Sequence, residues 1–117
     1  MPRRVIAAVN NLFFMGKIKA AARQAAVELT FASSPDDVLQ KTRAGAELVV
    51  FDLGDEGVGA LEALQELKLE PATAAVPTLG FLRHTQPDVA ARAREAGCDK
   101  VMARSEFSAQ LVELLRG

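Results

Sequence analysis

Short apolar runs alternate along the chain with longer segments in which apolar residues recur at helical spacing. The runs predict five strands, at about residues 3–9, 27–31, 48–52, 78–82 and 100–103. The segments between and after them predict five helices, at about residues 12–25, 34–45, 60–69, 86–97 and 106–115. Five strand–helix units in this length indicate an α/β domain with one parallel sheet, covered by helices on both faces.

Individual segments add detail to this prediction. The first run is apolar without a break, so we expect its strand to be buried on both faces. In the second run Glu28 and Thr30 alternate with apolar residues, which indicates an edge strand. Ser34 is the expected N-cap of the second helix, and Thr85 or Gln86 that of the fourth. The apolar spacing of the last helix predicts a buried face of Phe107, Leu111 and Leu114.

Length and composition favour a single domain over residues 1–117. Half of the residues are apolar, so one core can form without a metal or a disulfide. The net charge of -1 gives no general attraction to nucleic acid or anionic lipid, and we expect neither as a partner. With a single cysteine, Cys98, and no apolar run of membrane-spanning or signal-peptide length, we expect a cytoplasmic protein.

Four features indicate a family. Asp52 closes the third strand, Pro77 precedes the fourth, Gly97-Cys98-Asp99 precedes the fifth, and Arg104 follows it. With these features and this order of elements, the chain resembles the receiver domains of two-component response regulators over essentially its whole length. The resemblance implies a flavodoxin-like, doubly wound (βα)5 parallel sheet with strand order 2-1-3-4-5.

The resemblance also implies where a phosphorylation site would lie. Receivers hold Mg²⁺ with an acid pair after the first strand, the phosphoacceptor Asp and a backbone carbonyl. In this chain the acid pair falls on Asn10 and Asn11, the phosphoacceptor on Asp52 and the carbonyl on Gly54. Amide oxygens bring no charge, so we expect the affinity for Mg²⁺ to fall severely.

Other positions of the implied site also differ from the family pattern. Leu82 stands where receivers carry a Ser or Thr that binds the phosphoryl group, and Leu cannot donate a hydrogen bond. Arg104 stands where they carry Lys, and Val101 where they often carry a switch aromatic. The phosphoacceptor is present without its partners, which is the pattern of a pseudo-receiver. We expect no catalytic residues, no cofactor and no bound metal.

Asp52 has further interpretations. As a strand-end acid it could cap a loop or pair with Arg104, because both residues end neighbouring strands on one edge of the sheet, and we favour the pair. A metal cluster of Asp52 with Asp55 and Glu56 is the weaker alternative, since acids in a Gly-rich surface loop are usually solvated. The single histidine, His84, has no partner at useful spacing and is expected in a surface loop.

Leu12 and Phe13 are large and apolar at the start of the first helix, where receivers are usually polar. Phe14 and Ile18 already define the buried face of that helix. Leu12 and Phe13 therefore either fold over the empty acid pocket or form an exposed patch for a partner. We favour local packing.

Three functions are compatible with these features. The favoured one is a pseudo-receiver that acts by phosphorylation-independent protein–protein interaction and is not an enzyme. The first alternative is a receiver that is still phosphorylated on Asp52 in a phosphorelay. The second alternative is a small flavodoxin-like enzyme or nucleotide binder, although no phosphate-binding loop follows the first strand.

We expect a protein partner, because no effector domain follows the last helix. The resemblance implies the face of helix 4, strand 5 and helix 5, with a mixed-charge set of Arg92, Lys100, Arg104 and Glu113. The rival surface is the start of the first helix, where Leu12 and Phe13 supply apolar anchors. An exposed Phe13 would favour the first helix, and a Phe13 packed over the site would favour the other face.

Overall fold

Five parallel strands form the central sheet of the computed structural model, which describes residues 2–83 and 86–117. The strands are β1 Arg4–Ala8, β2 Glu28–Phe31, β3 Leu48–Asp52, β4 Thr78–Leu82 and β5 Lys100–Ala103. Their order is β2-β1-β3-β4-β5, which confirms the predicted flavodoxin-like, doubly wound (βα)5 sheet. The predictions for His84, and for Thr85 as a helix cap, lie outside the described residues.

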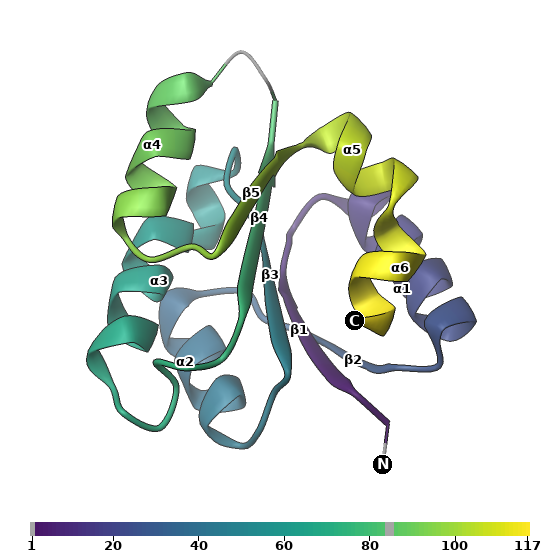
Figure 1. Cartoon of the computed structure of the whole chain (residues 1–117), viewed down its shortest axis with the longest axis horizontal. Coiled ribbons are helices and arrows are strands. Elements are labelled where there is room, and N and C mark those ends of the chain that lie inside the picture. The colour runs from purple at the N-terminus through teal and green to yellow at the C-terminus, as the bar shows by residue number, and fades with distance from the viewer. Residues whose placement is uncertain (1, 84–85) are drawn as a thin grey trace.

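Helices cover both faces of the sheet (Figure 1). They are α1 Leu12–Ala25, α2 Pro35–Arg43, α3 Ala60–Leu69, α4 Pro87–Glu95, α5 Arg104–Ala109 and α6 Leu111–Arg116. Figure 1 shows α2, α3 and α4 on one face of the sheet and α1, α5 and α6 on the other. None of the helices in residues 2–83 and 86–117 combines the length and the apolar character needed to cross a membrane.

Alternate residues of the central strands contribute to two hydrophobic cores, one under each layer of helices. In β3, Val49 and Phe51 pack with the side chains of α2, α3 and α4, whereas Leu48 and Val50 pack with those of α1, α5 and α6. β3 and β4 are buried along their whole length, as expected for parallel strands between two helix layers. β2 lies at an edge and alternates exposed and half-buried residues, as predicted.

Local signals place the starts of α2 and α3. Ser34 caps α2, because its Oγ accepts a hydrogen bond from the Asp37 backbone N–H at 3.1 Å. The loop after β3 contains a 3-10 turn, η1 Glu56–Val58, and ends at Gly59 with φ 67°. A Cβ on Gly59 would lie 2.6 Å from Pro35 Cγ, so the two helices can begin this close together only with glycine at this position.

The last helix differs from its prediction. Instead of one helix over 106–115, α5 and α6 are separated at Gln110, whose φ of -109° and ψ of 11° are not helical. Phe107 and Leu111 are buried as predicted, but Leu115 is fully buried and Leu114 only partly. Apolar spacing could not locate this break, because a single residue that leaves the helical conformation shifts the inward face by about one position.

Candidate functional site

Asp52 lies at the carboxyl end of β3, where open α/β sheets place their binding sites. Its side chain is only 1% exposed. The Gly54 backbone N–H donates a hydrogen bond to Asp52 Oδ1 at 3.1 Å, across the turn that leaves the strand. Within residues 2–83 and 86–117 this is the one hydrogen bond that the carboxylate accepts. A single hydrogen bond compensates only part of the hydration that the buried carboxylate loses.

Burial raises the pKa of the Asp52 carboxyl above its usual range, because the charged form loses its hydration. The hydrogen bond from Gly54 and the positive charge of Arg104 both lower the pKa, while the negative charge of Asp55 raises it. Burial is the largest of these effects. The carboxyl therefore stays protonated to a higher pH than an exposed aspartate.

The two asparagines after β1 are both exposed. Asn11 caps α1, because its Oδ1 accepts a hydrogen bond from the Phe14 backbone N–H at 3.2 Å. The Asn10 amide lies near Gly57, where a Cβ would be 4.0 Å from Asn10 Nδ2. Asn11 thus has a structural role that requires no metal.

The side chains at this edge do not fit Mg²⁺, which prefers octahedral oxygen ligands that include carboxylates. Asp52 is the one carboxylate at the expected ligand positions, and the Asn11 oxygen is engaged as a helix cap. Asp55 caps η1 by accepting from the Gly57 N–H at 2.9 Å, and Glu56 is exposed. In the described part of the chain, no group of three or more His, Cys, Asp or Glu residues is placed to hold a metal.

The remaining positions of the implied site are apolar or covered. Leu82 is buried in the core under α2, α3 and α4, and Val101 packs against the same core. Gly54 lies against Gln86, since a Cβ on Gly54 would be 3.1 Å from Gln86 Oε1. The sequence indicated Gln86 only as a possible helix cap. Its position beside Gly54 depends on how the start of α4 meets the loop after β3, which no local pattern encodes.

The predicted ion pair between Asp52 and Arg104 is wrong. Among the residues that the structure describes, no basic nitrogen lies within 4.0 Å of the Asp52 carboxylate oxygens. The guanidinium of Arg104 instead lies over the ring of Phe14, with its carbon 5.0 Å from the ring centroid. Arg104 Nε is buried without a hydrogen-bond partner among the described residues. β4 lies between β3 and β5, so the two residues do not end adjacent strands.

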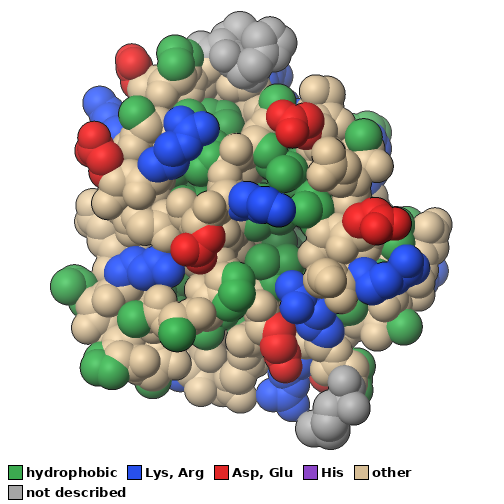
Figure 2. All heavy atoms as spheres, viewed as in Figure 1, with side chains coloured by type: hydrophobic (Ala, Val, Ile, Leu, Met, Phe, Trp, Pro, Cys, Tyr) green, Lys and Arg blue, Asp and Glu red, His purple; other side chains and the backbone are tan. Residues whose placement is uncertain are grey.

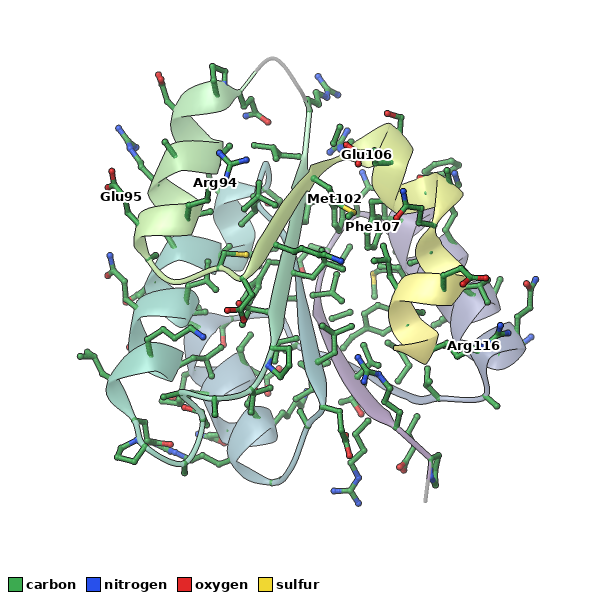
Figure 3. The ribbon with its side chains drawn as sticks, in the orientation of Figure 1. Arg94, Glu95, Met102, Glu106, Phe107 and Arg116 are labelled. Atoms are coloured by element: carbon green, nitrogen blue, oxygen red, sulfur yellow. The ribbon has the colours of Figure 1, made fainter. Side chains whose placement is uncertain are left out.

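The rings of Phe14, Phe81 and Phe107 form a cluster next to Asp52, and Arg104 borders it. The Phe14 and Phe81 ring centroids are 5.1 Å apart, and Phe81 stacks on Phe107 at 4.2 Å with an interplanar angle of 10°. Phe81 is the partner of Asp52 in the β3–β4 pairing. Figure 3 shows Phe107 pointing from α5 toward the interior. The sequence assigned Phe14 and Phe107 to buried faces but could not show that they meet around Phe81.

Leu12 and Phe13 are 84% and 65% exposed, so the favoured prediction that they pack over the site is wrong. The Asn11 cap starts α1 at Leu12, and Phe14 takes the inward position of the first turn. Because successive helical residues are rotated by about 100°, Phe13 then points into solvent. The alternative prediction of an exposed apolar patch at the start of α1 is confirmed.

The helix that begins with this exposed patch is basic. α1 carries Lys17, Lys19 and Arg23 and no acidic residue. The Lys17 ammonium lies 4.9 Å from the centroid of the Phe13 ring, in a cation–π contact. The exposed face of α1 therefore combines large apolar side chains with positive charge.

The face of α4, β5 and α5 has a hollow of about 210 Å³ beside β5. Figure 2 shows apolar side chains along the middle of this face, with a basic side chain among them and further charged side chains around them. Arg94 on α4 and Glu106 on α5 lie on opposite sides of the hollow (Figure 3). The predicted residues do not join this surface as one set: Arg92 lines a groove between α3 and α4, and Lys100 and Glu113 line a separate hollow that also includes the C-terminal Gly117.

No protein-family model matches the sequence, and no curated protein matches it. Solved structures do match. The phosphorylated cyanobacterial phytochrome response regulator RcpA superposes with a TM-score of 0.79 at 16% identity, over 100% of this chain and 91% of that chain. A response regulator protein from Burkholderia multivorans has a TM-score of 0.74 at 24% identity, over 98% of this chain and 93% of that chain.

A third structure is the receiver domain of a sensor histidine kinase from Pseudomonas aeruginosa, which has a magnesium ion coordinated in its active site cleft. Its TM-score is 0.81 at 14% identity, over 99% of this chain and 96% of that chain. The chain therefore has the fold of a response regulator receiver domain over its full length. At these identities the likeness concerns the fold, and the chemistry at Asp52 depends on this chain's own residues.

Proposed function

We propose that the chain is a pseudo-receiver, a signalling module of two-component type that binds a protein partner without phosphorylation and without catalytic turnover. The supporting observation is the set of side chains around Asp52. One position expected to hold Mg²⁺ is a helix cap, Asn11, and the other is an exposed amide, Asn10. The position of the phosphoryl-binding hydroxyl is the buried Leu82. Asp52 thus lacks the groups that would guide a phosphoryl donor.

The absence of a metal site is tested by titrating Mg²⁺, with and without a beryllofluoride phosphoryl mimic, while backbone amide shifts are recorded. We expect no saturable shift at Asp52, Leu53 or Gly54 in the natural chain. The double variant Asn10→Asp/Asn11→Asp restores two carboxylates at this edge and serves as the positive control. Saturable shifts in the natural chain that Asp52→Ala abolishes would contradict the proposal.

The start of α1 is the surface that we assign to the partner. Leu12 and Phe13 are exposed large apolar side chains of the kind that anchor protein interfaces. Phe13 lies beside Lys17, and α1 has no acid, so the surface suits a partner with an apolar pocket and negative charge. The exposure of Phe13 is the reason for preferring this surface to the face of α4, β5 and α5.

Recovery of a partner by variants of the immobilised chain tests this assignment. We expect Phe13→Ala to lose the partner and Asp52→Asn to retain it. Leu69→Ala is the control, because Leu69 is another exposed large apolar residue, 84% exposed like Leu12, but lies on α3 in the opposite helix layer. Arg94→Glu tests the rival surface. Loss with Arg94→Glu and retention with Phe13→Ala would transfer the interface to the face of α4, β5 and α5.

Phosphorylation of Asp52 is the alternative, supported by the carboxylate at the end of β3 and by the positive charge of Arg104 that acts on it. Incubation with a small-molecule phosphodonor followed by intact mass measurement decides between the two. The pseudo-receiver proposal expects an unchanged mass. An added phosphoryl mass that is absent from Asp52→Asn would replace it with a phosphorylated receiver.

A further inference from the structure

A hollow of about 390 Å³ lies at the amino-terminal ends of β3, β4 and β5, next to the end of α6. Leu48, the first residue of β3, lines it, whereas Asp52 is the last residue of the same strand. At a rise of about 3.3 Å per residue, the two residues are about 13 Å apart. The hollow is therefore separate from the site at Asp52, and its volume is in the usual range for small-molecule sites.

Strand alternation places Arg3 in this hollow and Arg4 outside it. Val5 packs on the face of the sheet that α1, α5 and α6 cover, and Arg3, two residues earlier, lines the hollow on that face. Arg4 lies on the opposite face, where its Nη1 donates a hydrogen bond to the Ala44 carbonyl oxygen at 3.3 Å. The backbone of Arg3 is held by strand pairing, because its carbonyl oxygen accepts from the Glu28 N–H at 2.8 Å.

The floor and one wall of the hollow are apolar. Leu48 and Leu79 line it from the sheet, and Leu114 lines it from α6. All three belong to or pack against the core under α1, α5 and α6, so their positions are fixed. An apolar group that covers these side chains would remove apolar surface from water on both partners, which favours binding.

The charged side chains around the hollow leave one cation without compensation. Asp99 is already engaged, because its Oδ2 accepts hydrogen bonds from the Thr78 N–H at 2.9 Å and the Thr78 hydroxyl at 3.1 Å. Lys100 and Glu113 are exposed and of opposite sign, so their effects on a charged ligand offset each other. Arg3 is half-buried, and among the described residues no carboxylate oxygen lies within 4.0 Å of its guanidinium.

Packing restricts the Arg3 guanidinium and removes part of its hydration. It lies against the backbone of Gly117, where an added Cβ would be 2.7 Å from Arg3 Nη1. Arg3 Nε is buried and has no hydrogen-bond partner in residues 2–83 and 86–117. Because part of the cost of desolvation is already present in the folded chain, a carboxylate bound at the remaining N–H groups would compensate the charge at little further cost.

We propose that this hollow binds a small organic acid, with its carboxylate on Arg3 and its apolar body on the three leucines. The planar guanidinium matches the two oxygens of a carboxylate, which suits Arg3 to this role. An inorganic anion would leave the apolar floor uncovered, and a cationic ligand would be repelled by Arg3. The hollow shares no residue with the Asp52 site or with the start of α1, so the proposal is independent of the proposed function.

The test is a titration of the isotope-labelled chain with 3-phenylpropionate, followed by backbone amide shifts. 3-Phenylpropionamide has the same apolar body without the charge, and acetate has the charge without the body. We expect 3-phenylpropionate to give saturable shifts at Leu48, Leu79 and Leu114 at millimolar concentration. The amide and acetate should each bind about tenfold more weakly or worse, since each lacks one of the two contacts.

Arg3→Gln should weaken the binding of 3-phenylpropionate about tenfold or more, because it removes the charge and the fork. Arg4→Gln is the matched control, since it makes the same change one residue along on the opposite face of the sheet, and it should leave the affinity unchanged. Lys100→Glu, which reverses an exposed charge at the rim, should also weaken binding and carries the test if Arg3→Gln does not fold. An effect of Arg3→Gln no larger than that of Arg4→Gln would overturn the proposal. Equal affinity for the acid and either of the other compounds, or no saturable shift at the three leucines, would also overturn it.

Discussion

At the residue scale, the buried Asp52 carboxyl makes stability depend on pH. Its pKa is raised by burial, so the folded chain binds the proton more tightly than the unfolded chain. This contribution to stability is fully present below the ordinary pKa of an aspartate and is lost as the pH rises through the raised pKa. We therefore expect Asp52→Asn to raise the melting temperature at neutral pH and to have a smaller effect in acid. Thermal unfolding across pH measures this, and a constant difference at every pH would contradict it.

Arg104 has the opposite effect on the same carboxyl. Its positive charge lowers the pKa of Asp52, so Arg104→Met should raise that pKa further. A carboxyl-carbon titration of Asp52 in both chains is the direct measurement. Arg94→Met is the control, because Arg94 is exposed on α4 and is not among the groups that shift Asp52. A pKa that Arg104→Met leaves unchanged would show that the charge does not act on Asp52.

At the element scale, Asn11 acts as the N-cap of α1. Asn11→Ala removes the acceptor for the Phe14 N–H and should lower the free energy of unfolding by about 0.5–2 kcal/mol. Asn11→Asp keeps the acceptor and places a negative charge at the helix N-terminus, so it should retain or increase stability. Urea unfolding of the two variants gives the comparison. Equal losses in both would mean that the cap does not depend on the side-chain oxygen.

At the scale of the whole molecule, the rings of Phe81, Phe14 and Phe107 connect β4 with α1 and α5. Phe81 is fully buried between the other two, so Phe81→Ala should lower the free energy of unfolding by about 3–5 kcal/mol. Phe13→Ala removes a ring of the same size from the surface and should change it by less than about 0.5 kcal/mol. Denaturant unfolding checks both values, and similar losses would place Phe13 in the core.

The prediction from sequence was most accurate where a local pattern and a buried face coincide. The bounds of β3, β4 and α3 agree with their predictions, because apolar runs and glycine, proline and serine boundaries act within a few residues. The apolar run placed Asp52 at the end of β3, and the resemblance supplied the strand order. It also showed which neighbours Asp52 lacks, since the identity of a residue at an aligned position needs no coordinates.

Contacts between distant elements were decided only by the tertiary structure. Arg104 stacks on Phe14 rather than pairing with Asp52, and Arg94 rather than Arg92 borders the hollow beside β5. Phe13 is exposed because Phe14 takes the fully inward position of the first turn. Periodicity states which residues share a face of one element, but it contains no information on the residues of another element that face them. Hydrophobic spacing therefore determined the elements, and the resemblance indicated the missing ligands. The packing of α1 and α5 against the sheet determined which side chains remained available at the surface.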